Sequence, residues 1–246
     1  MIDDEVCTDE NVPSLSSISK SIRYDLGYSF KKISCIPVEK ERHHAKQDQY
    51  IEAMMNINPT NVHFFDECSV NKTTGNRTRG HSEIGKPAFE IQRYSSNATY
   101  TVNLLVGFFG IHWYDIIEGP SNGLRLLQFF NHAIHVRDNE NNPILAPNDV
   151  VVMDNCGFHH GALVEPLLRD ILAANDVTLL FQPPYSPECN VCELCFHQLK
   201  TVLKRNEKYS SHYTELAIAD AISTITPVMC KHFFRHCGLD LVGQRL

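Results

Sequence analysis

The chain has 246 residues, of which 43% are hydrophobic, and a formal net charge of -7. It is long enough to bury a sizeable core in one or two domains. The negative charge disfavours a simple polyanion binder, because nonspecific affinity for nucleic acid depends on Lys and Arg side chains that neutralise phosphates. No apolar run approaches the ~20 residues that cross a bilayer, and the acidic N-terminus does not resemble a secretory signal. The nine cysteines are odd in number and scattered, which favours free thiols in a reducing compartment. We therefore expect a globular protein that is neither secreted nor bound to a membrane.

The N-terminal residues predict two helices before the main domain. Ser14 precedes apolar residues at helical spacing up to Leu26, and Gly27 is a stop signal, so a capped helix is expected here. This helix and the basic arm behind it are compatible with the last part of a helix-turn-helix, whose recognition helix would lie in the major groove of DNA. A helix that only packs against its neighbours is the alternative. Residues 37–55 predict a charged connecting helix.

The main domain alternates strands and helices. The predicted strands are 62–65, 98–106, 111–117, 149–155 and 177–181. The predicted helices run from 120 to 134, from 163 to 172 and from 190 to 203. Pro120 and Ser121 open the first of them, and its apolar side carries Leu124, Leu127, Phe130 and Ile134. Three strands are followed by helix, strand, helix, strand and helix, which is the order of an α/β domain with a mixed five-stranded sheet flanked by helices. Two further helices, at 213–225 and from Thr226 to Gly238, are expected to pack against this domain.

Three acidic residues stand at special positions in this pattern. Asp66 follows the first strand, and Asp154 ends a buried apolar run, at the edge where open α/β sheets bind ligands. Glu193 falls three residues after Asn190, which can cap the last helix of the domain. Ordinary explanations compete with a functional one: Asp154 can cap the following turn, and Glu193 can complete a capping box with Asn190. The local pattern alone leaves both explanations open.

A basic stretch lies between residues 71 and 93, where five Lys and Arg side chains stand against only Glu83 and Glu90. Its three glycines and Pro87 predict an exposed loop. Such a loop on an acidic protein could face phosphates, or it could be an ordinary solvated loop.

A cysteine cluster in the last helix of the domain offers a competing zinc interpretation. Its candidate ligands are Cys189, Cys192, Cys195 and His197. Steps of three residues place the thiols along one side of a helix, where cysteine behaves as a small buried hydrophobe, and the spacing of a two-knuckle zinc site is absent. We therefore favour buried thiols.

Three segments carry a resemblance to a known family. The residues FFDEC at 64–68, VVMDNCGFHH at 151–160 and PPYSPECNVCE at 183–193 are similar to the mariner-type DDE transposases. The most specific parts are DNxxxxH and PPYSPxxNxxE, and the similarity covers roughly residues 60 to 205. It implies an RNase H-like fold, with one acid on the first strand, one at the end of the fourth strand and one at the start of a later helix. The α/β pattern places the three acids in the same settings.

The resemblance implies a metal-dependent DNA endonuclease and strand transferase. Asp66, Asp154 and Glu193 would be catalytic and would hold two Mg²⁺ or Mn²⁺ ions, which stabilise charge on the attacking and leaving oxygens of a phosphodiester. The expected supporting residues are Asn155, His159 and Asn190. Asn155 could hydrogen-bond a catalytic carboxylate. His159 could orient the scissile phosphate or relay a proton, and a packing role is its alternative.

The resemblance also implies partners and a location. The partners would be double-stranded DNA with terminal inverted repeats, target DNA, and a second copy of the chain in a homodimer. The expected DNA contacts are Arg77, Arg79, Lys86 and Lys200. A eukaryotic protein of this kind would work in the nucleus, and a prokaryotic one in the cytoplasm.

The domain organisation departs from the family in two ways. We expect a small helix-turn-helix remnant and linker in residues 1–58, the catalytic domain in 59–206 and C-terminal helices in 207–246. The family usually carries two helix-turn-helix units, of which at most the second is present. The interval from Asp154 to Glu193 is also a few residues longer than in the best-known branches. The alternative function is therefore a catalytically inactive or host-adopted relic that binds DNA.

Overall fold

The computed structural model describes residues 13–29, 44–71, 74, 80–89 and 99–240. The chain divides into two compact units, residues 1–37 and 38–246.

The described residues of the N-terminal unit, 13–29, form a helix and a turn that continues it. Helix α1, Leu15–Lys20, starts at Ser14, whose side chain accepts a hydrogen bond from the backbone of Ser17, as predicted. It continues as a π-helical turn, Ser21–Asp25. Gly27 follows with a φ of 70°, in the left-handed region that ends helices. No residue of α1 or of the turn is buried, and the helix-turn-helix interpretation stays a prediction. The predicted arm behind this helix lies outside the described residues.

The second unit begins, in its described part, with helix α3, His44–Met55. It corresponds to the later part of the predicted connecting helix, whose first residues lie outside the described ranges. A single 3₁₀ turn, Pro59–Asn61, leads from α3 into the sheet.

The sheet has the predicted five strands. They are β1 Val62–Asn71, β2 Thr99–Gly107, β3 Gly110–Glu118, β4 Val150–Met153 and β5 Thr178–Phe181. Their spatial order is β3-β2-β1-β4-β5. The pairs β1–β2 and β2–β3 are antiparallel, and β1–β4 and β4–β5 are parallel, so the sheet is mixed as expected.

Strand β1 is longer than predicted, and this changes the setting of its acids. The apolar run stops at Phe65, but Asp66 and Glu67 continue the strand because β2 pairs with it as far as Asn71. The parallel neighbour β4 ends earlier, with Met153 opposite Phe65. Asp66 is therefore the first β1 residue beyond its parallel partner.

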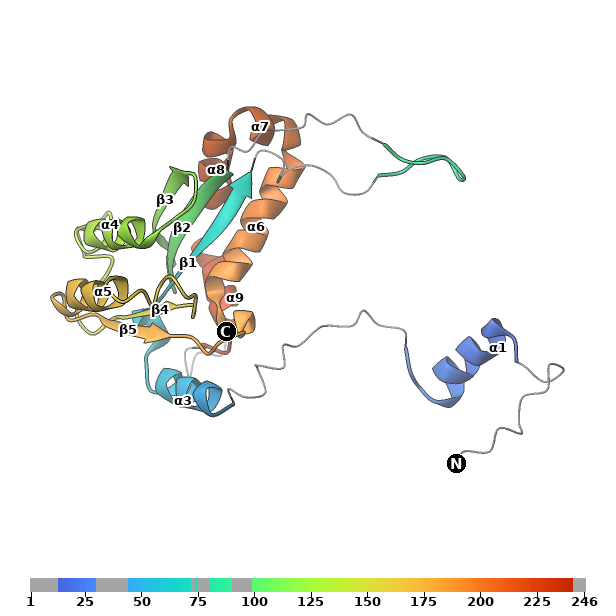
Figure 1. The fold of residues 1–246 in the computed structure, drawn as a ribbon, viewed down its shortest axis with the longest axis horizontal. Helices are drawn as coiled ribbons and strands as arrows, with labels where there is room; N and C mark the ends of the chain where they lie inside the picture. The colour runs from blue at the N-terminus through green and yellow to red at the C-terminus, as the bar shows by residue number, and fades with distance from the viewer. Residues whose placement is uncertain (1–12, 30–43, 72–73, 75–79, 90–98, 241–246) are drawn as a thin grey trace. The chain divides into compact units, whose positions relative to one another are not determined.

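Helices cover both faces of the sheet (Figure 1). Helices α4, Gly123–Ala133, and α5, Val164–Ala173, pack on one face. The other face carries α6 Val191–Arg205, α8 Thr214–Ser223 and α9 Pro227–His236. A short 3₁₀ turn, Pro187–Cys189, precedes α6. Helix α7, Glu207–His212, joins α6 to α8 and was not predicted.

Helix α4 starts later than expected, and its predicted apolar side is confirmed in part: Phe130 is buried, and Leu127 and Ile134 pack against the core. Asn122, rather than the Pro120–Ser121 pair, caps it, with the Asn122 side chain accepting from the backbone of Arg125 at 3.0 Å. The buried side chains are Leu126, Phe129, Phe130 and Ala133. Leu124, which was predicted to face the core, is exposed. In α5, Pro166 lies in the first turn, where its missing N–H breaks no helical hydrogen bond.

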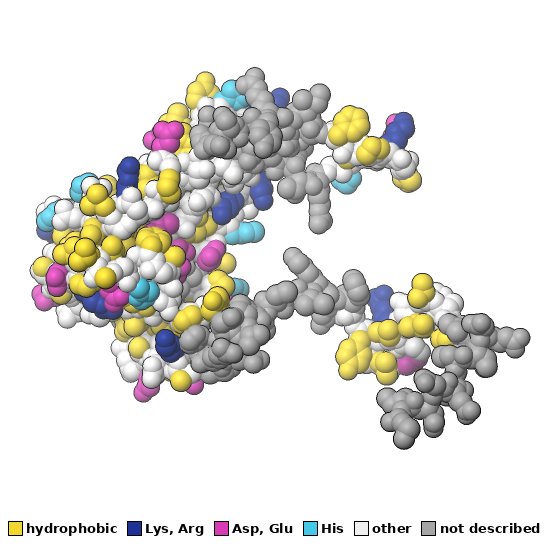
Figure 2. All heavy atoms as spheres, in the orientation of Figure 1, with side chains coloured by type: hydrophobic (Ala, Val, Ile, Leu, Met, Phe, Trp, Pro, Cys, Tyr) yellow, Lys and Arg dark blue, Asp and Glu magenta, His cyan; other side chains and the backbone are white. Residues whose placement is uncertain are grey.

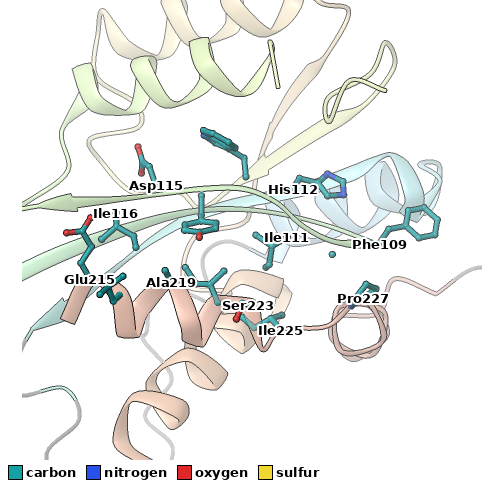
Figure 3. Close-up of a pocket in the computed structure, with 15 residues that line it drawn as sticks. Phe109, Ile111, His112, Asp115, Ile116, Glu215, Ala219, Ser223, Ile225 and Pro227 are labelled. Atoms are coloured by element: carbon teal, nitrogen blue, oxygen red, sulfur yellow. The ribbon is translucent and has the colours of Figure 1, made fainter. Parts of the chain in front are cut away.

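A cavity of about 950 Å³ lies between β3 and α8 (Figure 3). Its walls are mostly apolar: Ile111 and Ile116 of β3 face Ala219 and Ser223 of α8. None of its lining residues belongs to the predicted site. No helix in the described part of the chain combines the length and the apolarity that crossing a membrane requires.

The packing of α5 against the sheet predicts a contrast between two neighbouring leucines of this helix. Leu168 is 0% exposed and Leu167 is 49% exposed. We expect Leu168→Ala to lower the free energy of unfolding by about 2–5 kcal/mol, because it leaves a cavity in the core. Leu167→Ala should change it by no more than about 0.5 kcal/mol. Urea denaturation of both variants measures the difference, and equal effects would mean that α5 does not pack on the sheet as described.

Candidate functional site

The parallel pairing of β1 and β4 brings two predicted acids together. Phe65 and Met153 are register partners, and Asp66 and Asp154 follow them on adjacent strands. Neighbouring strands lie roughly 4.8 Å apart, so the two residues share one end of the pairing. Asp154 is the residue at which the chain leaves the sheet, as predicted.

The start of helix α6 supplies the third acid. Asn190 caps this helix through its side-chain oxygen, which accepts from the backbone of Cys192 at 3.0 Å. The amide nitrogen of the same side chain donates to Asp66 Oδ2 at 2.7 Å. Glu193 lies in the first turn of α6 with an exposed side chain. A single residue, Asn190, thus starts the helix and ties it to β1.

Asp66 is the buried centre of this acidic cluster. It is 8% exposed, and its Oδ1 accepts from the backbone of Glu67 at 2.7 Å. Burial, followed by the negative charge of Asp154, raises its pKa to about 8, and Glu67 and Glu193 add smaller repulsions. The hydrogen bond from the Glu67 backbone opposes this rise. The site therefore concentrates more negative charge than its own donors compensate.

His159 lies between two carboxylates. Its Nδ1 is 2.8 Å from Asp154 Oδ1, and its Nε2 is 3.2 Å from both carboxylate oxygens of Glu67. The ring is fully buried, which by itself lowers its pKa, but the hydrogen bonds to Asp154 and Glu67 outweigh burial and raise the pKa to about 10. His159 is therefore a buried cation next to a predicted catalytic acid.

Glu67 is a site residue that sequence reasoning missed. It stands beside Asp66 in FFDEC, and alternation along β1 turns it to the α4–α5 face, whereas Asp66 faces α6. The signal was the pair of adjacent acids on a strand. Its partner His159 is distant in sequence, so the local pattern gave no sign of the contact.

Asn155 has a different partner from the one expected. Its side-chain oxygen is hydrogen-bonded to His160 Nε2, while Asn190 makes the contact to Asp66, a predicted catalytic carboxylate. His160 Nδ1 is 2.7 Å from Glu165 Oε2, and Glu165 pairs with Arg169 at 2.8 Å. This chain of contacts holds the loop after β4 against α5.

The cysteines of α6 behave as buried side chains rather than as ligands. Cys192 and Cys195 are 0% exposed, and Cys192 Sγ donates to the carbonyl of Phe64 at 3.4 Å. His197 is exposed. Within the described residues no three His, Cys, Asp or Glu side chains are arranged to hold one metal ion.

The carboxylates of the acidic cluster are likewise not arranged around one ion in the described residues. Their chemistry nevertheless fits a divalent cation. Asp66 retains a proton at neutral pH only because burial and neighbouring carboxylates disfavour its charged form. A cation would reverse both effects. The donor atoms are carboxylate oxygens, which hard cations such as Mg²⁺ and Mn²⁺ prefer.

The predicted DNA contacts are only partly described. Lys200 is half-buried on α6, two turns after Glu193 and on the same side of the helix. Burial raises the pKa of the Cys68 thiol to about 12, and the positive charge of Lys200 is close enough to oppose this rise. Lys86 is exposed and pairs with Glu83. Arg77 and Arg79 lie outside the described residues.

A family model described as DDE superfamily endonuclease matches residues 61–215. This range contains β1 and α6 and all three predicted acids. A search among curated proteins finds no match.

Several solved structures share the fold. The Mos1 transposase paired-end complex with left transposon end is 13% identical, with a TM-score of 0.57 over 91% of this chain and 69% of that chain. The mariner Mos1 paired-end complex with Mg is 16% identical, with a TM-score of 0.56 over 92% of this chain and 71% of that chain. The Mos1 transposase catalytic domain with raltegravir and Mn is 12% identical, with a TM-score of 0.55 over 84% and 91%. The likeness confirms the predicted RNase H-like α/β fold.

The raised pKa of Asp66 predicts a pH-dependent cost to stability. An Asp side chain in the unfolded chain has a pKa near 3.8, whereas the pKa of Asp66 in the folded chain is about 8. Stability is therefore lost as pH rises between these values. We expect Asp66→Asn to raise the melting temperature of the metal-free protein at pH 8 by at least roughly 2–4 °C, the shift that 1 kcal/mol produces at this chain length.

The gain should shrink towards pH 4, where the folded wild-type carboxyl is protonated and the unfolded one is only partly ionised. Thermal unfolding by circular dichroism at pH 4, 6 and 8, with EDTA present, measures it. The matched control is Asp170→Asn, which changes an exposed carboxylate of α5. A gain that is independent of pH, or equal in the control, contradicts the raised pKa.

Proposed function

Because the chain belongs to the DDE superfamily endonucleases, we propose that it is a transposase-type DNA endonuclease and strand transferase, which cuts and joins phosphodiester bonds. Asp66, Asp154 and Glu193 are the proposed catalytic residues. The observation that carries the proposal is the convergence of carboxylate charge on buried Asp66, at the point where β1, β4 and the start of α6 meet. Perturbed acids gathered by separate elements are typical of catalytic sites.

The three acids would hold two Mg²⁺ or Mn²⁺ ions. When bound, such ions stabilise the negative charge that develops on the attacking and leaving oxygens of a phosphodiester. The Mos1 structures with Mg and with Mn, which share this fold, support the choice of cation. Within the chain, Asn190 orients the Asp66 carboxylate, and His159 holds the Asp154 carboxylate.

The proposed substrate is double-stranded DNA, as transposon ends and as target. The Mos1 complexes with transposon-end DNA support this choice. Lys200 and Lys86 are the proposed phosphate contacts among the described residues, and Arg77 and Arg79 complete the set. A homodimer and a nuclear location in a eukaryote are part of the proposal.

The second candidate is a DNA-binding relic without turnover. The described part of the chain has no three side chains already arranged around one ion, which favours a protein without turnover. The net charge of -7 weighs against DNA binding by either candidate. On the face in Figure 2, acidic and basic side chains of the described residues are interspersed rather than gathered in a broad basic surface.

DNA cleavage separates the two candidates. We expect the wild type to nick a supercoiled plasmid that carries the DNA flanking its gene, in Mg²⁺ or Mn²⁺ and not in EDTA. Asp154→Ala should reduce the nicking rate by more than about 100-fold, since even residues that only support metal ligands cost about 10–100-fold when changed. Asp170→Ala, an exposed change on α5, should retain the wild-type rate. A wild type that binds the DNA and never nicks it would establish the relic.

The role of Lys200 is tested by binding rather than cleavage. If Lys200 contacts a backbone phosphate, Lys200→Ala should weaken DNA binding and reduce the slope of log affinity against log salt by about 1. The matched control is Lys231→Ala. Lys231 lies over the ring of Phe109, in the β2–β3 turn, which lies beside His63 near the start of β1. Fluorescence anisotropy at several salt concentrations measures both slopes, and equal slopes would remove Lys200 from the DNA surface.

A further inference from the structure

The contacts of His159 join two acids that come from different elements. Asp154 stands at the end of β4, and Glu67 stands on β1, on the α4–α5 face of the sheet. The ring between them is 0% exposed, and the Glu67 side chain is 10% exposed. Glu67 therefore reaches Asp154 through His159, from behind the face on which Asp66 lies.

Each ring nitrogen of His159 has its own carboxylate partner. Nδ1 lies 2.8 Å from Asp154 Oδ1, and Nε2 lies 3.2 Å from Glu67 Oε2. The ring therefore bridges the two acids with one contact on each side.

Aromatic side chains enclose the ring and keep the arrangement dry. Phe158 packs edge-on against His159 with ring centroids 4.1 Å apart, and Phe65 does so at 6.3 Å. Asn103, the β2 residue opposite Glu67, is also fully buried. Charge-assisted hydrogen bonds are strong in such surroundings, and removing one partner leaves the other charge uncompensated.

We propose that Glu67 is a positioning residue for metal binding: it holds His159 against Asp154 and thereby fixes the Asp154 carboxylate facing Asp66. This inference rests on the proposed function. It assigns Glu67 no contact with the ion, because alternation along β1 places its side chain on the face opposite Asp66. Glu67 acts only through His159, so the effects of changing the two residues should not add.

Titration calorimetry with MnCl₂ on the metal-free protein tests this in a double-mutant cycle. We expect Glu67→Gln to keep the fold and to weaken Mn²⁺ binding by about 10–100-fold, the usual effect of removing a group that orients a ligand. His159→Gln should weaken it similarly. The double variant should bind no more weakly than His159→Gln alone, because each change breaks the same link.

A second Glu–His pair, between the loop after β4 and helix α5, supplies a control. Glu165 contacts His160 at 2.7 Å, and neither residue is one of the proposed metal ligands. Glu165→Gln should leave the Mn²⁺ affinity within about twofold of the wild type, which is smaller than the 10–100-fold expected for an orienting residue.

Each other outcome overturns the proposal in a distinguishable way. Additive losses in the double variant would make Glu67 a direct ligand. Lower melting temperatures with unchanged Mn²⁺ affinity would give Glu67 a purely structural role. A wild type that binds no Mn²⁺ would overturn the proposed function together with this inference, whereas a wild type that binds Mn²⁺ while Glu67→Gln binds equally well would overturn the inference alone.

Discussion

The hydrogen bond from Asn190 to Asp66 joins residues 124 positions apart and sets the geometry of the acidic cluster. Its donor belongs to the residue that starts α6, and its acceptor belongs to the central strand. The place where α6 begins, and therefore where Glu193 stands, is fixed relative to Asp66. The apolar side of α6 then covers β1 through Cys192, Phe196 and Leu199. Packing energy from that core holds α6 on the sheet and thereby holds Glu193, in the first turn of the helix, in place.

The cluster is electrostatically unequal, and the inequality follows from the donors. Asp154 faces an imidazolium, whereas Asp66 faces an amide and a backbone N–H. The second acid, Asp66, is left with a pKa raised to about 8. A protein selected for stability alone would replace a buried carboxylic acid with an apolar group. Retaining it beside three other carboxylates is typical of a site that works with a positive partner.

Much of the fold follows from local sequence, and the misses have identifiable physical causes. The apolar runs and their order predicted the five strands, and the Asn190 cap predicted the start of α6. The apolar pattern predicted that β1 ends before Asp66. The strand continues to Asn71 because its polar residues pair with β2. In α4, Leu124 of the predicted apolar side is exposed, because the helix packs on the sheet through Leu126, Phe129, Phe130 and Ala133, and the helical period alone does not contain that packing.

The sequence predicted a site residue only where the pattern of the residue's own strand or helix singles out its position. Asp154 and Glu193 stand at a strand end and a helix start that the sequence reveals, and Asp66 stands where the apolar run of β1 ends. Glu67 finds its partner 92 positions away, across the sheet. Asn190 was expected as a cap, and its second role depends on where β1 passes. Such contacts are set by tertiary packing, which no window of sequence contains.

The negative charge of the chain bears on the order of events at the site. Four carboxylates, those of Asp66, Glu67, Asp154 and Glu193, gather at the site, and His159 contacts two of them. A DNA phosphate approaching this cluster meets like charge, and the cost is large because Asp66 and His159 are buried. Under the proposed function, cations must therefore be bound before the scissile phosphate can enter. The acidity that argues against simple DNA binding then becomes a reason for cleavage to depend on metal ions at two levels, first for the approach of the substrate and then for the chemistry.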